Sequence, residues 1–165
     1  MFRVRDVVMH PTEGVCRVTD LREEMFSGEK LLYYLLVPLR DGVKSKIYVP
    51  VNSAVIPLRR LLTKAEIRTV LARVPALDDI WCDTERERVE RFGEVLRSGD
   101  HARIIQMIAL LHHYKDQQQS DGKKFHKSDE HLLKEAEAII HSEFSYALGM
   151  DEKATISYIM KKIAV

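Results

Sequence analysis

The sequence has few of the features that mark enzymes and metal proteins. Its two cysteines, Cys16 and Cys82, lie far apart and neither belongs to a CxxC pair, so neither a zinc site nor a disulfide framework is predicted. The seven histidines form no HExxH pattern, and GxSxG, P-loop and GxGxxG motifs are absent. These motifs carry most nucleophilic, metal and nucleotide chemistry. We therefore expect a protein that is not an enzyme, with no metal, no cofactor and no small-molecule substrate.

Long apolar runs are also missing. None approaches the roughly 18 residues that a membrane-spanning helix needs. The first six residues, Met1–Asp6, carry charge too early to hold the apolar region of a signal peptide. A hydrophobic fraction of 45% and a charged fraction of 31% are typical of soluble globular proteins. We expect a cytoplasmic protein without membrane contact.

A strong excess of one charge is absent as well. The net charge of the 165 residues is +1, which does not by itself indicate a nucleic-acid-binding protein. Residues 1–62 hold 10 Lys and Arg against 7 Asp and Glu, whereas residues 63–165 hold 16 against 18. The second part is therefore slightly acidic, which favours a protein partner over DNA.

The first 60 residues are rich in short apolar runs separated by turn signals, a pattern typical of β-strands. Turns are predicted at His10–Gly14, Ser27–Gly28 and Asp41–Gly42. Strands are predicted at Val4–His10, Val15–Leu21, Lys30–Val37 and Lys46–Val51, with a fifth near Ala54–Leu58. The continuous apolar run in the third strand favours a small, strongly bent sheet or barrel.

From Thr63 the apolar spacing becomes helical. Capping boxes are predicted at Thr63 and Thr84, and Ser128 is predicted to cap a long amphipathic helix. Helices are predicted from Thr63 to Pro75, from Thr84 to Ser98, over about 101–117, from Ser128 to Gly149 and from Asp151 onward. The change of period predicts an α+β fold with two domains, a β-domain over 1–60 and an all-α domain over 61–165.

The segment Phe2–Cys16 resembles the signature of the CarD/CdnL family of bacterial transcription regulators, roughly F-x-x-G-D-x-V-V-H-P-x-x-G-V-G. The family shares this N-terminal module with transcription-repair coupling factor. Further segments that resemble the family are Tyr33–Leu35, Ile47–Val51, Leu58–Arg59, Leu96–Asp100 and Ser128–Ala136. The resemblance implies a Tudor-like N-terminal domain that binds the β subunit of RNA polymerase. It also implies a helical domain that contacts DNA at the upstream edge of the melted promoter.

Two residues depart from the family signature, because Arg5 and Cys16 stand where it has glycine. Arg5 is free of backbone strain only if its φ is negative. Cys16 is small enough for an extended strand.

The resemblance implies that polymerase is bound by sheet extension, in which an edge strand pairs with a strand of the partner. The edge predicted by position runs from Lys44 to Val49, with Lys44, Lys46, Ile47, Tyr48 and Val49 as binding residues. Alternatively, Tyr48 packs within its own domain and Lys46 only protects the edge from aggregation.

Trp81 is the only tryptophan. A tryptophan in this region of the family is implied to wedge into the DNA minor groove, where an apolar side chain stabilises partly unstacked base pairs. Alternatively, Trp81 packs between the two domains.

Phosphate contacts require lysine or arginine on an exposed face. The predicted contacts are Arg86, Arg97, Lys123, Lys124 and Lys127, the lysines forming the denser cluster. On the helix from Thr84, a solvent face with an Arg91–Glu87 ion pair is an alternative. No arrangement that reads bases is visible, so DNA binding with little sequence specificity is expected.

The resemblance, supported by the β-then-α division, implies a transcription regulator that binds polymerase and stabilises open promoter complexes through the helical domain. The alternative is an adaptor that binds polymerase or another protein without contacting DNA.

Overall fold

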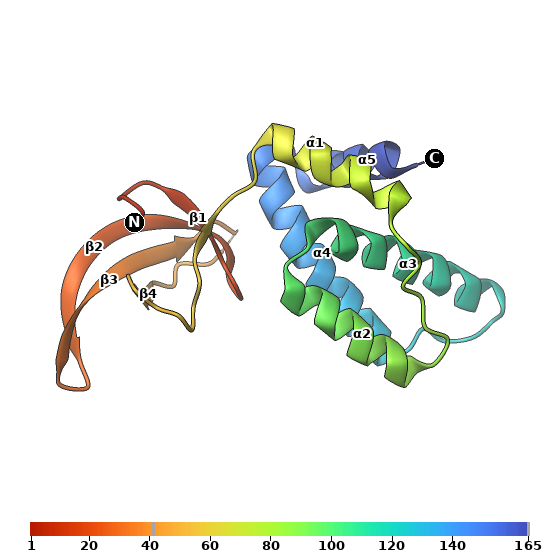
Figure 1. Cartoon of the computed structure of the whole chain (residues 1–165), viewed down its shortest axis with the longest axis horizontal. Helices are drawn as coiled ribbons and strands as arrows, with labels where there is room; N and C mark the ends of the chain where they lie inside the picture. Colours follow the sequence, from red (N-terminus) through yellow and green to blue (C-terminus); the bar gives the residue numbers. More distant parts are fainter. Residues whose placement is uncertain (41, 165) are drawn as a thin grey trace. The chain divides into compact units, whose positions relative to one another are not determined.

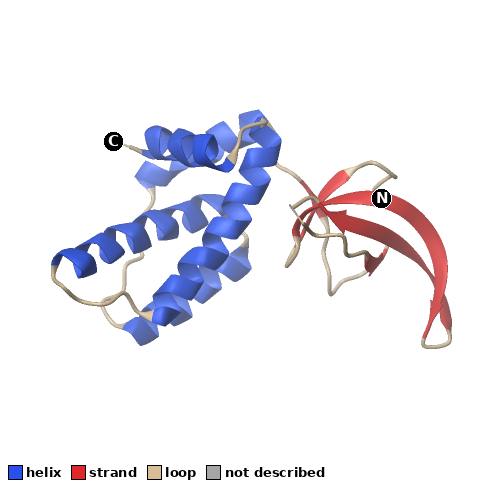
Figure 2. Ribbon diagram, turned by 180° about the vertical axis from the view of Figure 1, so that it is seen from behind, coloured by secondary structure: helices blue, strands red, loops and turns tan. Residues whose placement is uncertain are grey.

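The computed structural model describes residues 1–40 and 42–164 of the chain. The chain divides into two compact units, Met1–Leu62 and Thr63–Val165. All strands lie in the first unit and all helices in the second (Figures 1 and 2). The predicted α+β fold is confirmed.

The N-terminal unit is a five-stranded antiparallel sheet with the strand order β4-β3-β2-β1-β5. Its strands are β1 (Val7–His10), β2 (Gly14–Phe26), β3 (Glu29–Pro38), β4 (Ile47–Pro50) and β5 (Arg59–Arg60). The two long strands, β2 and β3, curve strongly (Figure 1), as the bent-sheet prediction requires. The core of this unit is one apolar cluster that includes Val8, Cys16, Val18, Tyr34, Leu36 and Val49.

Several strand limits differ from the prediction. The fifth strand is Arg59–Arg60 instead of Ala54–Leu58, because residues 51–56 form turns and bends and Pro57 has no N–H for a sheet hydrogen bond. β2 extends past Leu21 because Phe26 pairs with Glu29 across a two-residue turn. That turn is the predicted Ser27–Gly28. Both of its residues have positive φ, 54° and 82°, as a hairpin of this length favours. The predicted turn at Asp41–Gly42 includes Asp41, which lies outside the described residues.

The β1–β2 turn is held by the buried ring of His10. Its Nδ1 accepts hydrogen bonds from the backbone N–H groups of Thr12 (3.2 Å) and Glu13 (3.1 Å). Burial lowers the pKa of His10, although the Glu13 carboxylate opposes this shift. Burial also raises the pKa of the Cys16 thiol to about 11, with a smaller contribution from Glu13. The neutral Cys16 is therefore a core residue and a poor nucleophile.

Arg5 has a φ of 82°, so the condition for an unstrained backbone is not met. A non-glycine residue with positive φ carries a strain of about 1–2 kcal/mol. Glycine removes this strain, but it loses more backbone entropy on folding, which offsets part of the gain. We therefore expect Arg5→Gly to stabilise the N-terminal unit by about 0.5–1 kcal/mol. Amide hydrogen exchange at Val18, whose N–H donates to Asp6 beside the strained residue, measures this gain. Arg3→Gly is the matched control, since Arg3 is exposed and lacks the positive φ. Equal or faster exchange in Arg5→Gly contradicts the assignment of strain.

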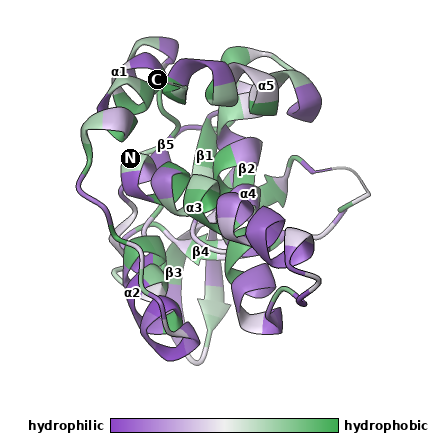
Figure 3. Cartoon of the chain, turned by 90° about the vertical axis from the view of Figure 1, so that its right-hand side faces the viewer, coloured by the Kyte–Doolittle hydropathy of each residue, from purple (hydrophilic) through white to green (hydrophobic). Residues whose placement is uncertain are grey.

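The helical unit holds five α-helices and one 3₁₀-helix among the described residues. They are α1 (Lys64–Arg73), η1 (Val74–Ala76), α2 (Glu85–Ser98), α3 (His101–Ser120), α4 (Lys127–Leu148) and α5 (Glu152–Ile163). The predicted capping box is present at Thr63. At Thr84 only half of the predicted box is found among the described residues, because the hydroxyl accepts from the N–H of Glu87 without a return bond from the Thr84 N–H to the Glu87 carboxylate. Each helix carries hydrophilic and hydrophobic residues (Figure 3), as amphipathic packing requires.

Two helix limits differ from the prediction. α4 begins one residue before Ser128 and has His126 as its N-cap residue. Ser128 does not cap the helix, because its hydroxyl donates instead to the Glu85 carboxylate of α2 at 2.5 Å. α3 continues to Ser120, through glutamines that favour helix as readily as a polar loop. None of the helices in the described part of the chain is long and apolar enough to cross a membrane.

Candidate functional site

Trp81 lies in the Trp81 loop (residues 77–84), which connects η1 to α2. Its indole is partly exposed. One side of the ring contacts Tyr114 of α3, with ring centroids 4.9 Å apart, and Phe92 of α2, at 6.2 Å. The backbone N–H of Trp81 donates to the Asp79 carboxylate at 2.9 Å. The side chain is therefore packed on the helical unit and still partly accessible.

A buried ion pair lies beneath the Trp81 loop. The guanidinium of Arg88 on α2 donates through Nε (3.1 Å) and Nη2 (2.8 Å) to the two carboxylate oxygens of Asp129 on α4. The two side chains are 1% and 0% exposed. Burial acts to lower the pKa of Arg88, but the hydrogen bonds and charge of Asp129, with help from Tyr114, raise it above its ordinary value. The guanidinium therefore remains charged inside the unit.

The same guanidinium holds the Trp81 loop. Its Nη1 donates to the backbone carbonyls of Cys82 (3.1 Å) and Asp83 (2.9 Å). Its central carbon lies 5.0 Å from the ring centre of Trp81 and 4.6 Å from that of Tyr114. One charged group therefore contacts the indole and the two peptide units that follow it.

The lysine cluster (Lys123, Lys124 and Lys127) lies at the same end of the helical unit as the Trp81 loop. Tyr114 contacts Trp81 on one side and Phe125 on the other, with the Tyr114 and Phe125 ring centres 6.2 Å apart. The α3–α4 loop also reaches the first turn of α2 (Figure 1), where His126 lies 3.6 Å from the Glu85 carboxylate. All three lysines are exposed, and in the part of the chain that the structure describes none of them forms an ion pair.

The two predicted arginines of α2 are separated. Arg86 is exposed in the first turn, near the lysine cluster, whereas Arg97 is in the last turn, about 16 Å away along the helix axis. The guanidinium of Arg97 lies over Gly93. Within residues 1–40 and 42–164 no ion pair joins Arg91 to Glu87, so the alternative of a salt-bridged face on α2 is not supported.

β4 is an edge strand of the N-terminal sheet and pairs on one side with β3. The exposed Lys44 and Lys46 precede it. Ile47 and Val49 point into the core, so only their main chain is available to a partner. Tyr48 is 38% exposed and makes edge contacts with Phe26 and Tyr33, with ring centres 5.7 and 6.4 Å away.

The main chain of Tyr48 faces the open edge. The N–H of Val51 donates to Leu32 of β3 at 2.9 Å. In an antiparallel pair, hydrogen-bonded and non-hydrogen-bonded positions alternate. Val51, Val49 and Ile47 therefore bond toward β3, and Tyr48 directs its N–H and C=O away from β3.

The profile of one protein family, the CarD-like/TRCF RID domain, matches residues 2–62. This range coincides with the unit that holds the edge strand. The N-terminal unit is a CarD-like/TRCF RID domain. The resemblance seen in the sequence is thus confirmed for this unit, and domains of this family are interaction modules for RNA polymerase. No curated protein matches the chain.

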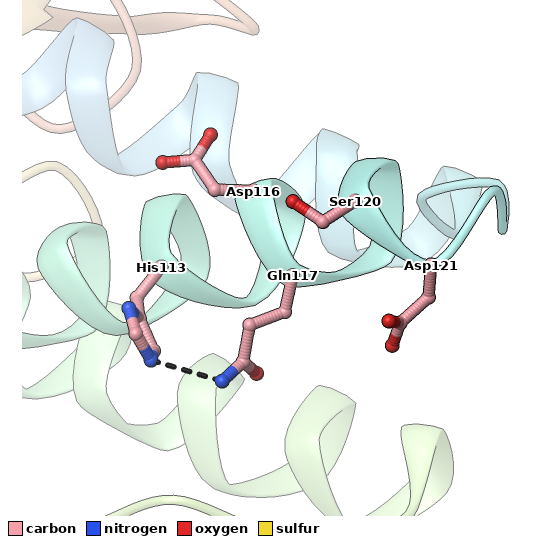
Figure 4. Close-up of a pocket in the computed structure, with 5 residues that line it drawn as sticks. All are labelled: His113, Asp116, Gln117, Ser120 and Asp121. Carbon is pink, nitrogen blue, oxygen red and sulfur yellow. Dashed lines mark hydrogen bonds between the residues drawn. The ribbon is translucent and has the colours of Figure 1, made fainter.

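The helical unit that follows the RID domain has a shallow hollow on its surface, about 450 Å³ in volume. It is lined by His113, Asp116, Gln117, Ser120 and Asp121, all on or next to the last turns of α3. Figure 4 shows that Asp116 and Asp121 point in different directions, while the side chains of Gln117 and His113 meet at 3.1 Å. The hollow therefore lacks converging catalytic groups. Within the described residues no group of His, Cys, Asp and Glu side chains is placed to hold a metal ion.

Sequence reasoning missed Arg88 and Asp129, although the sequence carried a signal for them. Arg88 precedes Phe92 by four residues, and Asp129 precedes Leu132 and Leu133 by three and four. Each charged residue therefore lies on the apolar face of its helix. Opposite charges on two apolar faces indicate a buried pair, but only the packing of α2 against α4 identifies the partners.

Proposed function

We propose that this protein is a transcription regulator that binds the β subunit of RNA polymerase through its RID domain and stabilises open promoter complexes through DNA contacts of the helical unit. The proposed DNA contact is supported by one observation: the rings of Trp81, Tyr114 and Phe125 form a row that connects a partly exposed indole to the lysine cluster. An apolar wedge and phosphate-binding cations are the two components that a minor-groove contact at a distorted duplex requires.

The contact depends on the shape of the DNA. Lys123, Lys124 and Lys127 supply charge without the bidentate geometry by which side chains distinguish bases. Arg86 extends the basic surface from the first turn of α2, whereas Arg97 is too distant to share one short contact with Trp81. Binding is therefore expected at the junction of duplex and melted DNA with little preference for sequence.

Polymerase binding uses the open edge of β4. A strand of the β subunit that pairs with β4 exchanges hydrogen bonds with the main chain of Tyr48, and Lys44 and Lys46 lie beside it. We expect Tyr48→Pro, which removes the outward N–H, to weaken polymerase binding about tenfold, as the loss of one or two hydrogen bonds implies. Fluorescence titration with polymerase measures this change. Tyr48→Ala, which keeps the N–H, is the control and separates the role of the main chain from that of the ring. Equal affinities for Tyr48→Pro and wild type rule out sheet extension at β4.

The DNA contact is tested by reversing the charge of the lysine cluster. We expect Lys123→Glu, Lys124→Glu and Lys127→Glu together to abolish the stabilisation of open complexes while polymerase binding is unchanged. The control reverses three exposed lysines of α5, Lys153, Lys161 and Lys162, which follow the opposite end of the long helix α4. Equal losses in the two triple variants indicate a general charge effect and contradict a specific contact.

An adaptor that binds polymerase or another protein without DNA is the second candidate. It is favoured by the carboxylates around Trp81, where Asp78, Asp79 and Asp83 are exposed, and by the acidic balance of residues 63–165. An adaptor retains its full effect when the lysine cluster is reversed, so the same experiment separates the two functions.

A further inference from the structure

We infer that Arg88 and Asp129 are positioning residues, which hold the indole of Trp81 in the orientation that engages DNA. This inference rests on the proposed function. The side chains of Arg88 and Asp129 are buried and do not reach a partner themselves. Their role is to orient the side chain of Trp81, which contacts the DNA.

The hydrogen bonds of Arg88 are distributed in a way that serves this task. Two of them join the guanidinium to Asp129, which fixes its plane relative to α4. Two more go to the carbonyls of Cys82 and Asp83, which directly follow Trp81. The guanidinium also lies against the rings of Trp81 and Tyr114. The plane of one side chain therefore fixes both the backbone and the ring at the tip of the loop.

The other end of the Trp81 loop is also anchored. The carbonyl of Asp78 accepts from Arg103 Nη1 and from Gln106 Nε2, both on α3 and both at 2.8 Å. Ile80, next to Trp81, is buried with 8% of its surface exposed. The indole thus lies between two fixed points, and Arg88 provides the one on its C-terminal side.

The folding stability of the helical unit does not by itself explain a buried ion pair in this position. Two buried charges lose their hydration, and well-packed apolar residues of similar size are often equally stable. Apolar side chains, however, cannot bond the carbonyls of Cys82 and Asp83. A loop ordered before binding also avoids the entropy cost of immobilising a large aromatic side chain on contact with DNA. The pair therefore supplies orientation, which an apolar core cannot provide.

The test replaces the pair with Arg88→Met and Asp129→Leu together in the full-length chain. This double variant leaves no unpaired charge, so the unit is expected to fold with an unchanged far-UV spectrum, and it releases the two carbonyls. Because Trp81 is the only tryptophan, its fluorescence reports on the loop alone. We expect at least a twofold increase in quenching by acrylamide and a lower anisotropy.

The functional readout is the lifetime of open promoter complexes at saturating protein. The double variant is expected to lose most of the stabilisation that Trp81→Ala loses, with unchanged polymerase binding, and to add nothing further when combined with Trp81→Ala. Tyr146→Phe alters an exposed aromatic residue near the opposite end of α4 and serves as the control, with wild-type quenching and lifetime expected.

The outcomes distinguish this inference from the proposed function. If Trp81→Ala shortens the lifetime and the folded double variant does not, the positioning role is wrong and the wedge remains. If Trp81→Ala has no effect on lifetime, the wedge in the proposed function is wrong, and the quenching measurement still decides whether the pair orders the loop. Unchanged quenching and anisotropy in the double variant overturn the inference in either case.

Discussion

Trp81→Ala is expected to shorten the lifetime of open promoter complexes about tenfold at saturating protein, because contact between an aromatic side chain and a base contributes about 1–3 kcal/mol. The indole is partly exposed at one end of the helical unit, with the lysine cluster beside it. Removing the ring leaves those lysines and the RID domain unchanged. The loss should therefore appear in the lifetime and not in the affinity for polymerase.

The lifetime is measured after a competitor blocks re-formation of open complexes. Trp81→Phe keeps a smaller ring and is expected to retain part of the effect. Tyr146→Ala removes an aromatic residue that is 45% exposed near the opposite end of α4, and it is expected to behave as wild type. A wild-type lifetime for Trp81→Ala contradicts the wedge, and loss of polymerase binding in that variant indicates a folding defect instead.

Asp129→Ala is expected to destabilise the helical unit by about 3–5 kcal/mol, since it leaves the Arg88 charge buried without its partner. Arg88 and Asp129 are almost fully inaccessible, and their two hydrogen bonds join α2 to α4. A loss of this size is a large part of the stability of a small unit. A larger unfolded fraction at ordinary temperature is therefore expected.

Denaturant unfolding followed by far-UV circular dichroism measures this loss, because the described helices all belong to this unit. Asp116→Ala removes an exposed carboxylate of α3 and is expected to change the free energy of unfolding by less than about 0.5 kcal/mol. The double variant Arg88→Met with Asp129→Leu is expected to regain most of the stability lost in Asp129→Ala. A loss below about 1 kcal/mol in Asp129→Ala contradicts a buried, charged pair.

Regular patterns in the sequence predicted the fold well. Apolar alternation and helical spacing identified the β-then-α order, and the side-chain chemistry of Thr63, Thr84 and Asp151 marked three helix starts that the structure confirms. The limits that were wrong depend on longer-range contacts. Serine is a common N-cap residue, but the hydroxyl of Ser128 donates a hydrogen bond to the carboxylate of Glu85 on another helix instead of capping its own.

The candidate site was only partly predictable. The sequence offered Trp81, the lysines and the edge segment as candidates, and their roles stay predictions. It gave no means of knowing that Tyr114 and Phe125 connect the first two. Arg88 is one of many arginines in a charged helix, and its burial depends on the packing of α2 against α4. The strain at Arg5 was equally hidden, because φ at one position follows from the whole path of the chain.

The most direct test of the central claim, that one surface binds polymerase and another acts on DNA, is the open-complex lifetime measured as a function of protein concentration. The account predicts that Tyr48→Pro requires about tenfold more protein yet reaches the wild-type lifetime. It predicts that the lysine-cluster variant binds polymerase at the wild-type concentration but gives no increase in lifetime at any concentration. If the lysine-cluster variant reaches the full wild-type lifetime, the helical unit does not act through DNA and the account is contradicted.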